Sequence, residues 1–341
     1  MARVMVMMSG GVDSSVAAAL LRDAGHDVTG VTLKLWGGES DSGCCSVSDV
    51  EDARRVAAQL GIPHYVFNFS DDFDANVVAP YVDAYAAGET PNPCVECNRT
   101  MKFGHVLERA RRLDYDFVAT GHHARIVETA AGRALARGAD PAKDQSYVLY
   151  MLGPDELAYT LLPVGELTKS EVRDRARDLG LRTADKRESM DVCFIKRGGR
   201  EAFLGARIER RSGTIVDEHG EVLGAHDGID SFTIGQRRGL GVAVGERRYV
   251  TDIAARTATV TVGPHDALLQ ERVLLRDVRW TQRESQSRPI YVQFRAHGTA
   301  VSATVDGDEV VFASPQPRVA PGQVVAFYDG DVCCGGGLVA E

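Results

Sequence analysis

The sequence predicts an α/β protein with an N-terminal parallel-sheet domain, a small central domain that contains strands, and a C-terminal β-barrel. Three observations support this fold class. Apolar runs alternate with helical patterns over the first part of the chain, which is typical of βαβ units. After Lys186 the chain becomes rich in glycine and arginine. From about Glu271, short alternating strands follow with Asp-Gly turn signals.

Length and composition agree with this division. The chain has 341 residues, more than one domain usually contains. With 44% hydrophobic and 26% charged residues and a net charge of −9, it is neither disordered nor fibrous. Any nucleic-acid partner must therefore bind a local basic patch. The apolar run Val4–Met8 is too short for a signal peptide or a membrane span, so we expect a cytoplasmic protein.

The N-terminal part contains mostly alternating strands and helices. Ser48 and Glu51 have capping-box spacing, and Gly61 and Pro63 end the helix that follows. A second such box, Thr168 with Glu171, opens a helix that runs to about Leu179. The predicted strands are Arg3–Met8, Val28–Trp36, His64–Phe69 and Phe117–Thr120, and the other predicted helices are Asp13–Ala24, Ser48–Leu60, Phe73–Ala87 and Phe103–Arg112.

The later part contains mostly strands. We expect a small β-containing domain over Ala202–His265, with short runs at Gly213–Val216 and Ser231–Ile234. The barrel strands are predicted at Ile290–Ala296, Val301–Val305, Glu309–Ala313 and Gln323–Tyr328, with hairpin turns at Asp306-Gly307 and Asp329-Gly330. The resulting domain boundaries are 1–200, 201–266 and 267–341.

The strongest chemical signal is the segment Ser9–Ser15, Ser-Gly-Gly-Val-Asp-Ser-Ser, where the first strand turns into the first helix. Glycines allow the backbone to approach a phosphate, while the hydroxyls and the first helical N–H groups supply donors. This predicts an anion cradle. The chain has neither a Walker A lysine nor a Gly-x-Gly-x-x-Gly pattern at this point, which disfavours kinases and NAD enzymes.

The seven cysteines form a second signal, because an odd number without an export signal indicates thiols or ligands before structural disulfides. Cys94 and Cys97 make a Cys-x-x-Cys after a proline-rich approach, close to basic residues that favour a thiolate at Cys97. Cys193 lies alone between two basic clusters. These three thiols could also hold an iron–sulfur cluster with an open position. The vicinal pairs Cys44-Cys45 and Cys333-Cys334 are interpreted as structural or incidental.

The segment Ser9–Ser15 resembles the pyrophosphate loop of ATP pyrophosphatases, which cleave ATP between the α and β phosphates. An ordered set of further motifs resembles the bacterial tRNA-specific 2-thiouridylases of the MnmA type and covers nearly the whole chain. The motifs are Ser9–Ser15, Thr90–Asn98, Met101–Phe103, Thr120–His122, Lys143–Tyr147, Pro163–Leu167, Cys193–Ile195, Gly235–Gly241 and Pro321–Gln323.

The resemblance implies ATP-dependent 2-thiolation of the wobble uridine of tRNA, at position 34, with AMP and pyrophosphate as products. It implies Cys97 as nucleophile and Cys193 as persulfide carrier, which close a transient catalytic disulfide. It also implies ATP with Mg²⁺, tRNA, a sulfur-carrier or cysteine desulfurase protein as sulfur donor, and a reductant. The implied ATP-binding residues are Met7, Met8, Ser9, Gly10, Gly11, Val12, Asp13, Ser14, Leu33 and Gly121.

The resemblance further implies a set of tRNA contacts: Asn92, Pro93, Cys94, His122, Lys143, Asp144, Gln145, Arg295, Ala296 and Gln323. Two of these depart from the family pattern. Many members have Asp at the position of Cys94, and a thiol, with its higher reference pKa, cannot simply inherit an acid/base role. At Ala296 the family more often has an aromatic residue. The arginines within Arg197–Arg211, with Arg237, Arg238, Arg247 and Arg248, are either a tRNA phosphate footprint or a solvated face.

Three alternatives remain open at the level of sequence. The same thiolation could use an iron–sulfur cluster on Cys94, Cys97 and Cys193. A nitrogen-transferring ATP pyrophosphatase would need an amine or ammonia but no thiols. An RNA-binding or metal-binding module would hold phosphate in the glycine loop without turnover.

Overall fold

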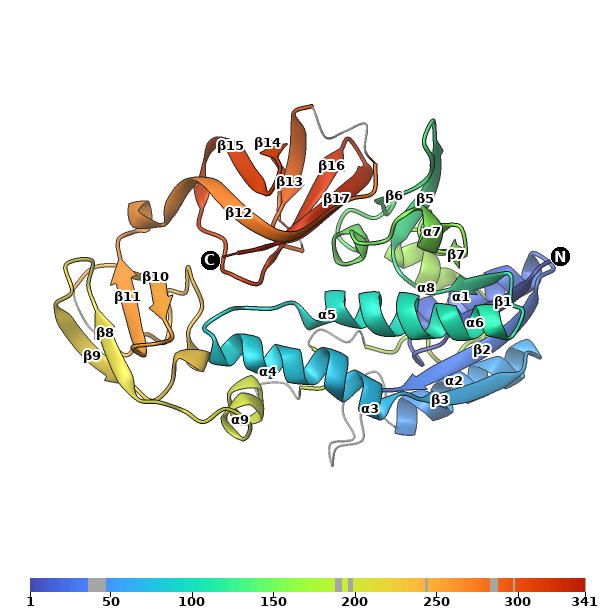
Figure 1. Ribbon diagram of the computed structural model, residues 1–341. Helices are drawn as coiled ribbons and strands as arrows, with labels where there is room; N and C mark the ends of the chain where they lie inside the picture. The colour runs from blue at the N-terminus through green and yellow to red at the C-terminus, as the bar shows by residue number, and fades with distance from the viewer. Residues whose placement is uncertain are drawn as a thin grey trace.

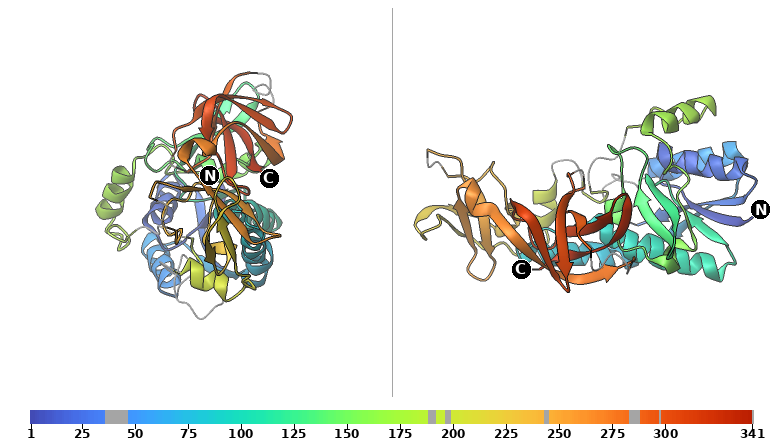
Figure 2. Two further views of the ribbon diagram at one scale, coloured as in Figure 1. Left: turned by 90° about the vertical axis from the view of Figure 1, so that its left-hand side faces the viewer. Right: turned by 90° about the horizontal axis from the view of Figure 1, so that it is seen from above.

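The computed structural model describes residues 1–35, 47–187, 192–195, 199–242, 245–282, 288–296 and 298–340. The molecule is elongated, and its three parts follow one another along its length (Figures 1 and 2). An α/β unit that contains the N-terminus forms one end, a small sheet forms the other, and a barrel lies between them. The predicted fold class is confirmed.

The N-terminal unit contains a five-stranded parallel sheet. Its strand order is β3-β2-β1-β4-β7, and every neighbouring pair is parallel. The two central strands are almost continuously buried, as expected for a sheet that is covered on both faces. The strands are β1 (Arg3–Met7), β2 (Asp27–Lys34), β3 (His64–Asn68), β4 (Phe117–Ala119) and β7 (Thr160–Leu161).

Alternate residues of β1 face two separate apolar cores. Val4 and Val6 pack with three helices on one face, whereas Met5 and Met7 pack with two long helical rods on the other. The three helices are α1 (Val12–Asp23), α2 (Val47–Leu60) and α8 (Lys169–Asp178). The rods are α3 (Ser70–Phe73), η1 (Asp74–Val78) and α4 (Ala79–Ala86), then α5 (Pro93–Glu96), η2 (Cys97–Val106) and α6 (Leu107–Arg112), where η1 and η2 are π-helical.

The predicted elements of this unit are present, with changed ends. The helix predicted from Phe103 begins earlier, at Pro93, because the Asn92 side chain accepts a hydrogen bond from the Cys94 N–H and so caps it. Helix α2 begins at Val47, one residue before the predicted start. The strand predicted to reach Trp36 ends at Lys34, and Trp36 lies outside the described residues.

A hairpin that the sequence did not predict connects this unit to the barrel. It consists of β5 (Ala124–Thr129) and β6 (Gly132–Arg137), and β6 pairs with the last barrel strand at Ala136 and Val332. The barrel sheet therefore continues into the N-terminal part of the chain. Short helices complete the region: η3 (Ser146–Leu149), α7 (Pro154–Leu157) and α9 (Arg200–Gly205).

The central part is a four-stranded sheet of order β10-β11-β8-β9 around its own small core. Its elements are β8 (Gly213–Val216), β9 (Val222–His226), η4 (Ile229–Ser231), β10 (Tyr249–Ala254) and β11 (Thr259–Gly263). The short run Ser231–Ile234 does not form a strand. Ser231 ends a 3-10 turn, and the Thr233 N–H is taken by the Gln236 side chain at 3.0 Å, so this apolar run forms a turn.

The C-terminal part is a closed antiparallel barrel. Six strands run in the order β12-β15-β14-β13-β16-β17, and β12 also pairs with β17. Gly307 and Gly330 have φ of +60° and +58° at the two predicted hairpin turns. The elements are η5 (His265–Leu268), β12 (Leu269–Trp280), β13 (Ile290–Gln293), β14 (Val301–Asp306), β15 (Glu309–Pro317), β16 (Val324–Asp329) and β17 (Val332–Val339).

Within the described parts of the chain, no helix combines the length and the apolar character that a membrane crossing requires.

Candidate active site

The glycine-rich loop lies between the end of β1 and the start of α1. Gly10 has φ +72°, and a Cβ there would lie 2.3 Å from the Asp49 carbonyl oxygen, so only glycine fits. The loop is held by its own serines: Ser14 Oγ accepts from the Ser9 N–H at 3.1 Å, and the Ser15 hydroxyl donates to the Gly11 carbonyl at 2.8 Å. Gly11 supplies no side-chain cap, which leaves the first N–H groups of α1 suited to an anion.

A second loop meets the first at the carboxyl edge of the sheet. It follows β4, the neighbour of β1, at the point where the strand order reverses and where open α/β sheets bind ligands. A Cβ on Gly121 would lie 2.5 Å from the Ser14 backbone nitrogen. The two loops are therefore in direct backbone contact. Leu33, which the family resemblance implies as an ATP-binding residue, is buried near the end of β2.

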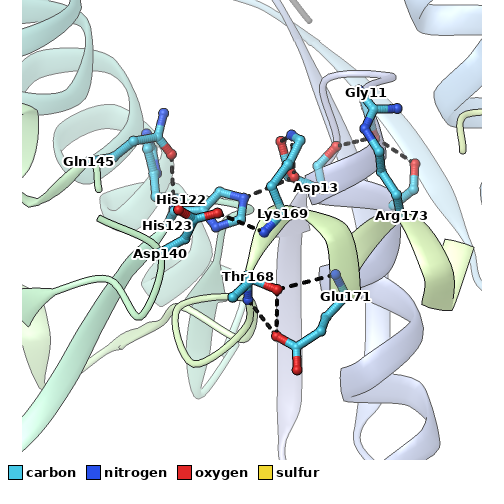
Figure 3. Close-up of polar contacts among 12 residues, drawn as sticks. Gly11, Asp13, His122, His123, Asp140, Gln145, Thr168, Lys169, Glu171 and Arg173 are labelled. Carbon is cyan, nitrogen blue, oxygen red and sulfur yellow. Dashed lines mark hydrogen bonds and ion pairs between the residues drawn. The ribbon is translucent and has the colours of Figure 1, made fainter. Parts of the chain in front are cut away.

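Asp13, in the first turn of α1, is the centre of a charged cluster (Figure 3). Lys169 Nζ lies 2.7 and 2.6 Å from its two carboxylate oxygens, and His123 Nε2 lies 3.0 Å from one of them. Burial alone would raise the pKa of Asp13, but the hydrogen bonds from His123 and Lys169 outweigh it, so the pKa is lowered. The carboxylate is therefore ionised and neutralised within the site.

The capping box predicted at Thr168 and Glu171 places Lys169. The Thr168 and Glu171 side chains bond reciprocally to each other's backbone N–H groups at the start of α8. Lys169 is the first residue of this helix and extends toward Asp13 (Figure 3). The cap was predicted from the sequence and Lys169 was not, although a cation beside a predicted helix start was a usable signal.

A second lysine joins the glycine loop to α2. Lys186 Nζ donates to the Gly10 carbonyl at 2.9 Å and to the Asp49 and Asp52 carboxylates at 2.6 and 2.7 Å. Burial alone would lower the pKa of Lys186. The hydrogen bonds to Asp49 and Asp52 and the charges of these carboxylates outweigh that effect, so the pKa is raised. No local pattern marked Lys186, because its partners are distant in sequence.

His122, after β4, is buried and neutral. Thr120 Oγ1 lies 2.7 Å from its Nδ1, and Lys102 Nζ lies 3.5 Å from its Nε2. Burial, and then the charge of Lys102, hold the pKa of His122 well below its usual value. Lys102 also donates to the Asn98 side chain at 2.9 Å. These contacts join the loop after β4 to the helical rod that carries the Cys-x-x-Cys motif.

The structure brings two of the predicted cysteines into one apolar cluster. Cys97 is buried at the first residue of π-helix η2, and Cys193, far along the chain, is half-buried in the same cluster. π-helical turns occur often at functional sites. Cys94, one turn before Cys97, is exposed.

The vicinal cysteines have separate surroundings. Cys333 and Cys334 are buried on β17 and face different apolar cores. Burial raises the pKa of Cys333 to about 12, so this thiol is protonated at neutral pH and suits a structural position. Cys44 and Cys45 lie outside the described residues.

The predicted cluster ligands lie within the described residues. Across those ranges, no group of three or more His, Cys, Asp and Glu side chains is found that could hold a metal ion. The iron–sulfur alternative on Cys94, Cys97 and Cys193 stays a prediction.

Two of the predicted tRNA contacts have their side chains turned into the protein. Asp144 is buried and accepts from Arg137 at 3.0 Å and from the Ser146 hydroxyl at 2.9 Å. The Gln145 side chain accepts from the His123 N–H at 2.9 Å. The segment that follows Lys143 thus supports the loop that carries His123.

Three further predicted contacts, Arg295, Ala296 and Gln323, lie in the barrel part of the chain. Gln323 Nε2 donates to the Thr90 carbonyl, just before the helix cap at Asn92 and Pro93. The carbonyls of Arg295 and Ala296 accept from the Gln293 side chain at 2.9 and 3.0 Å, and both residues are exposed. The barrel therefore holds the segment that leads into the Cys-x-x-Cys motif.

Three family models match the chain in succession. They are described as a tRNA methyl transferase HUP domain over residues 2–197, a tRNA methyl transferase PRC-barrel domain over 201–264 and an aminomethyltransferase beta-barrel domain over 270–339. Relatives named tRNA-specific 2-thiouridylase MnmA match along the entire chain. Those from Roseiflexus sp. (strain RS-1) and Chloroflexus aggregans are each 48% identical, over 100% of this chain and 100% and 99% of their own lengths.

The chain belongs to the tRNA-specific 2-thiouridylase family.

This membership confirms the resemblance that the ordered motifs predicted. A thiouridylase from Corynebacterium kroppenstedtii is 47% identical over 99% of this chain and 95% of its own. The U34-tRNA thiolase NcsA from Methanococcus maripaludis with its [4Fe-4S] cluster has 18% identity and a TM-score of 0.35 over 60% of this chain and 65% of that chain. Similarity at that level places no residue of the thiouridylase site.

Proposed function

We propose that this chain is a tRNA-uridine 2-sulfurtransferase, which converts the wobble uridine of tRNA to 2-thiouridine with release of AMP and pyrophosphate. The observation that carries the proposal is the pair Cys97 and Cys193, which share one apolar cluster. Cys97 lies on the continuous helix that begins after the Asn92 cap. The persulfide route of thiolation uses two cooperating thiols. Membership of the family favours this reaction over nitrogen transfer.

The glycine loop would bind ATP, which is the substrate as its Mg²⁺ complex. The uncapped N-terminus of α1 supplies backbone N–H donors for phosphate oxygens. Attack of the uracil C2 oxygen on the α-phosphate forms an adenylated base and expels pyrophosphate. The proposed ATP-binding residues are Met7, Met8, Ser9, Gly10, Gly11, Val12, Asp13, Ser14, Leu33 and Gly121.

The sulfur step would use both cysteines. A sulfur-donor protein loads Cys193 as a persulfide, and the Cys97 thiolate attacks the inner sulfur of that persulfide. The released sulfide attacks C2 and displaces AMP, while the two cysteine sulfurs become a disulfide. A two-electron reductant then restores both thiols. Cys97 is thus the nucleophile, and the disulfide is transient.

The tRNA would meet the enzyme around the start of α5. Its proposed contacts are Asn92, Pro93, Cys94, His122, Lys143, Asp144, Gln145, Arg295, Ala296 and Gln323. The wobble base must leave the anticodon stack to reach the site, as single-stranded bases do when proteins recognise them. Because Asp144 and Gln145 use their side chains internally, they would act through backbone groups or by holding the loop. A cytoplasmic location remains a prediction.

We also propose that the chain divides into functional domains at 1–200, 201–266 and 267–341. The first would hold ATP and the cysteines, and the other two would shape the tRNA surface. The separate apolar core of the central sheet supports the second boundary.

A thiolation assay tests the proposal. Purified enzyme is incubated with unmodified tRNA, ATP and a persulfide donor, and 2-thiouridine and AMP are quantified by mass spectrometry. Wild type should form both. Cys97→Ser and Cys193→Ser should lose 2-thiouridine, whereas Cys333→Ala, which removes a buried thiol elsewhere, should retain it.

Other outcomes separate the alternatives. Product formed without Cys97 or Cys193 would overturn the persulfide route. Stoichiometric iron after anaerobic purification, lost in Cys94→Ser as well as in the other two variants, would assign sulfur transfer to a cluster. AMP formed with an amine and without the thiols would indicate nitrogen transfer, and no AMP under any condition would indicate a binding module.

A further inference from the structure

A pocket of about 320 Å³ in the central domain belongs to none of the sites described above. Its wall is formed by the turn Gly239–Val242 and by the side chains of Arg237, Glu246, Arg247 and Arg248. Gly239 and Gly241 have φ of +72° and +74°, so the turn depends on glycine at both positions. Leu240, between them, is buried and anchors the turn to the core of the central sheet.

The arginines of the central domain separate into two groups. Arg248 is bound by Glu218 and Glu246, each at 2.5 Å, and Arg210 is bound by Asp230 at 2.8 Å. These guanidinium groups are neutralised within the protein. Arg211 donates to the Arg256 carbonyl at 2.9 Å and so holds a turn.

Arg237 and Arg247 differ from these arginines, which are bound within the protein. Both are exposed, both line the pocket, and within the described residues neither guanidinium forms a hydrogen bond or an ion pair with the protein. The carboxylate of the same pocket, Glu246, is already engaged by Arg248. The pocket therefore presents two cations with unfilled donors, which suits an anion with several acceptor oxygens.

The pocket turn is connected to the proposed active site. Gln236, next to Arg237, accepts from the Thr233 N–H, and Thr233 Oγ1 lies 3.5 Å from Thr90 Oγ1. Thr90 lies two residues before the Asn92 cap. A Cβ on Gly88 would lie 3.0 Å from the Ile253 side chain, which shows that the same segment packs on the central sheet.

We infer that Arg237 and Arg247 form a binding site for the phosphate backbone of the tRNA substrate, beside the nucleotide that enters the active site. The inference rests on the proposed function. A chain of net charge −9 attracts RNA only through local positive surfaces. This pocket is one such surface, and Gln236 and Thr233 join its turn to Thr90, which precedes the Cys-x-x-Cys segment. The site positions tRNA and takes no part in ATP binding or sulfur transfer.

The test compares Arg237→Gln, Arg247→Gln and the double variant with Arg256→Gln. Arg256 is also an exposed arginine of the central domain, but it lies outside the pocket. Affinity for unmodified tRNA is measured by filter binding over a range of salt concentrations. The double variant should bind about tenfold more weakly, and the slope of log K against log salt should fall by about one for each phosphate that the variant no longer binds. Arg256→Gln should match wild type.

Steady-state kinetics supply the second readout. The double variant should raise KM for tRNA while kcat and KM for ATP remain at wild-type values, because the ATP loop is untouched. A raised KM for ATP would assign the pocket to a nucleotide phosphate instead, and would overturn the inference. Unchanged tRNA affinity and salt slope in the double variant, with wild type still thiolating tRNA, would overturn it while leaving the proposed function intact. Failure of wild type to bind or thiolate tRNA would reject the proposed function itself.

Discussion

At the scale of single residues, Asp13 shows how the site balances charge. Its side chain is partly buried at a helix N-terminus, and Lys169 and His123 approach it from α8 and from the loop after β4. Lys169 is only 12% exposed, so solvent screens this pair less than a surface ion pair. Removing one partner would leave the other charge without compensation in a site of restricted solvation.

We predict that Lys169→Ala destabilises the fold and weakens ATP use together. The unfolding free energy should fall by about 2 kcal/mol at pH 7. Because the folded-state pKa of Asp13 is lowered, its stabilisation is present above the unfolded value near 3.8 and is lost as pH falls through the folded value. Urea unfolding at a series of pH values should therefore show the difference from wild type closing below about pH 3.8.

The conservative variant Lys169→Arg serves as the control for this prediction. It keeps a cation near Asp13 and should recover most of the stability. A Lys169→Ala protein with wild-type stability at pH 7 would show that the ion pair does not contribute.

At the scale of elements, glycine is needed at Gly121 and at Gly11 for different reasons. A Cβ on Gly121 would press on the Ser14 backbone, whereas a Cβ on Gly11 would only touch the Ser9 hydroxyl at 3.4 Å, and Gly11 has an ordinary φ of −92°. Gly121 is required because the two loops pack against each other there. Gly11 is required only if a ligand approaches the backbone of this residue.

We predict that Gly121→Ala lowers both the melting temperature and AMP formation, while Gly11→Ala lowers AMP formation with little change in melting temperature. Thermal unfolding and the AMP assay on both variants check this. Wild-type turnover in Gly11→Ala would mean that phosphate does not approach the loop at that residue.

Much of this edge of the sheet could be predicted from the sequence, because strand ends and glycine turns are local patterns. The ion pairs could not. Lys169 is 156 positions from Asp13, and Lys186 is 176 positions from Gly10. Only the folded chain brings such groups together, and no spacing rule applies to them.

The barrel shows a second limit of local patterns. Strand β12 pairs with β15 in its first half and with β17 in its second, with a register shift between Arg276 and Arg279, so its apolar residues do not alternate cleanly. Strand β17 contains Gly335–Gly337, which resembles a loop in sequence. A Cβ on Gly335 would lie 2.0 Å from the Arg279 carbonyl oxygen, so barrel closure requires this glycine.

At the scale of the whole molecule, buried polar groups join the barrel to the N-terminal unit. The Tyr328 hydroxyl lies 2.9 Å from Ser146 Oγ, which donates to Asp144, and the Arg137 guanidinium lies 3.7 Å from the centre of the Tyr328 ring. Burial holds the pKa of Tyr328 well above its usual value, so the hydroxyl remains a neutral donor or acceptor. A satisfied buried network of this kind fixes one arrangement of its members.

We predict that Tyr328→Phe lowers the unfolding free energy by about 1–2 kcal/mol, because the Ser146 hydroxyl loses a buried partner. Tyr291, its neighbour across the strand pair, is 52% exposed, so Tyr291→Phe is the matched control and should change little. Chemical denaturation of both variants measures the difference. Equal effects would show that the interface hydroxyl carries no stability of its own.

The barrel also holds the segment that precedes the Cys-x-x-Cys helix. Arg276 on β12 contacts both oxygens of Glu89, at 3.0 and 2.6 Å. The Thr90 N–H donates to the Pro321 carbonyl at 2.8 Å, and Gln323 donates to the Thr90 carbonyl. A segment fixed on both sides in this way presents the Asn92 cap, and hence the proposed base site, in one position.

We predict that Arg276→Ala disturbs tRNA use and leaves ATP binding intact. Without the guanidinium, Glu89 loses its partner and the segment loses one of its anchors, so KM for tRNA should rise by about tenfold. KM for ATP should not change, because the glycine loop is held by other residues. The control is Arg272→Ala. Arg272 lies on the same strand and pairs with Glu309, the first residue of β15, at 3.2 Å, and this variant should behave as wild type. If both variants raise KM for tRNA equally, the barrel acts through its overall charge and the Arg276–Glu89 pair does not position the segment.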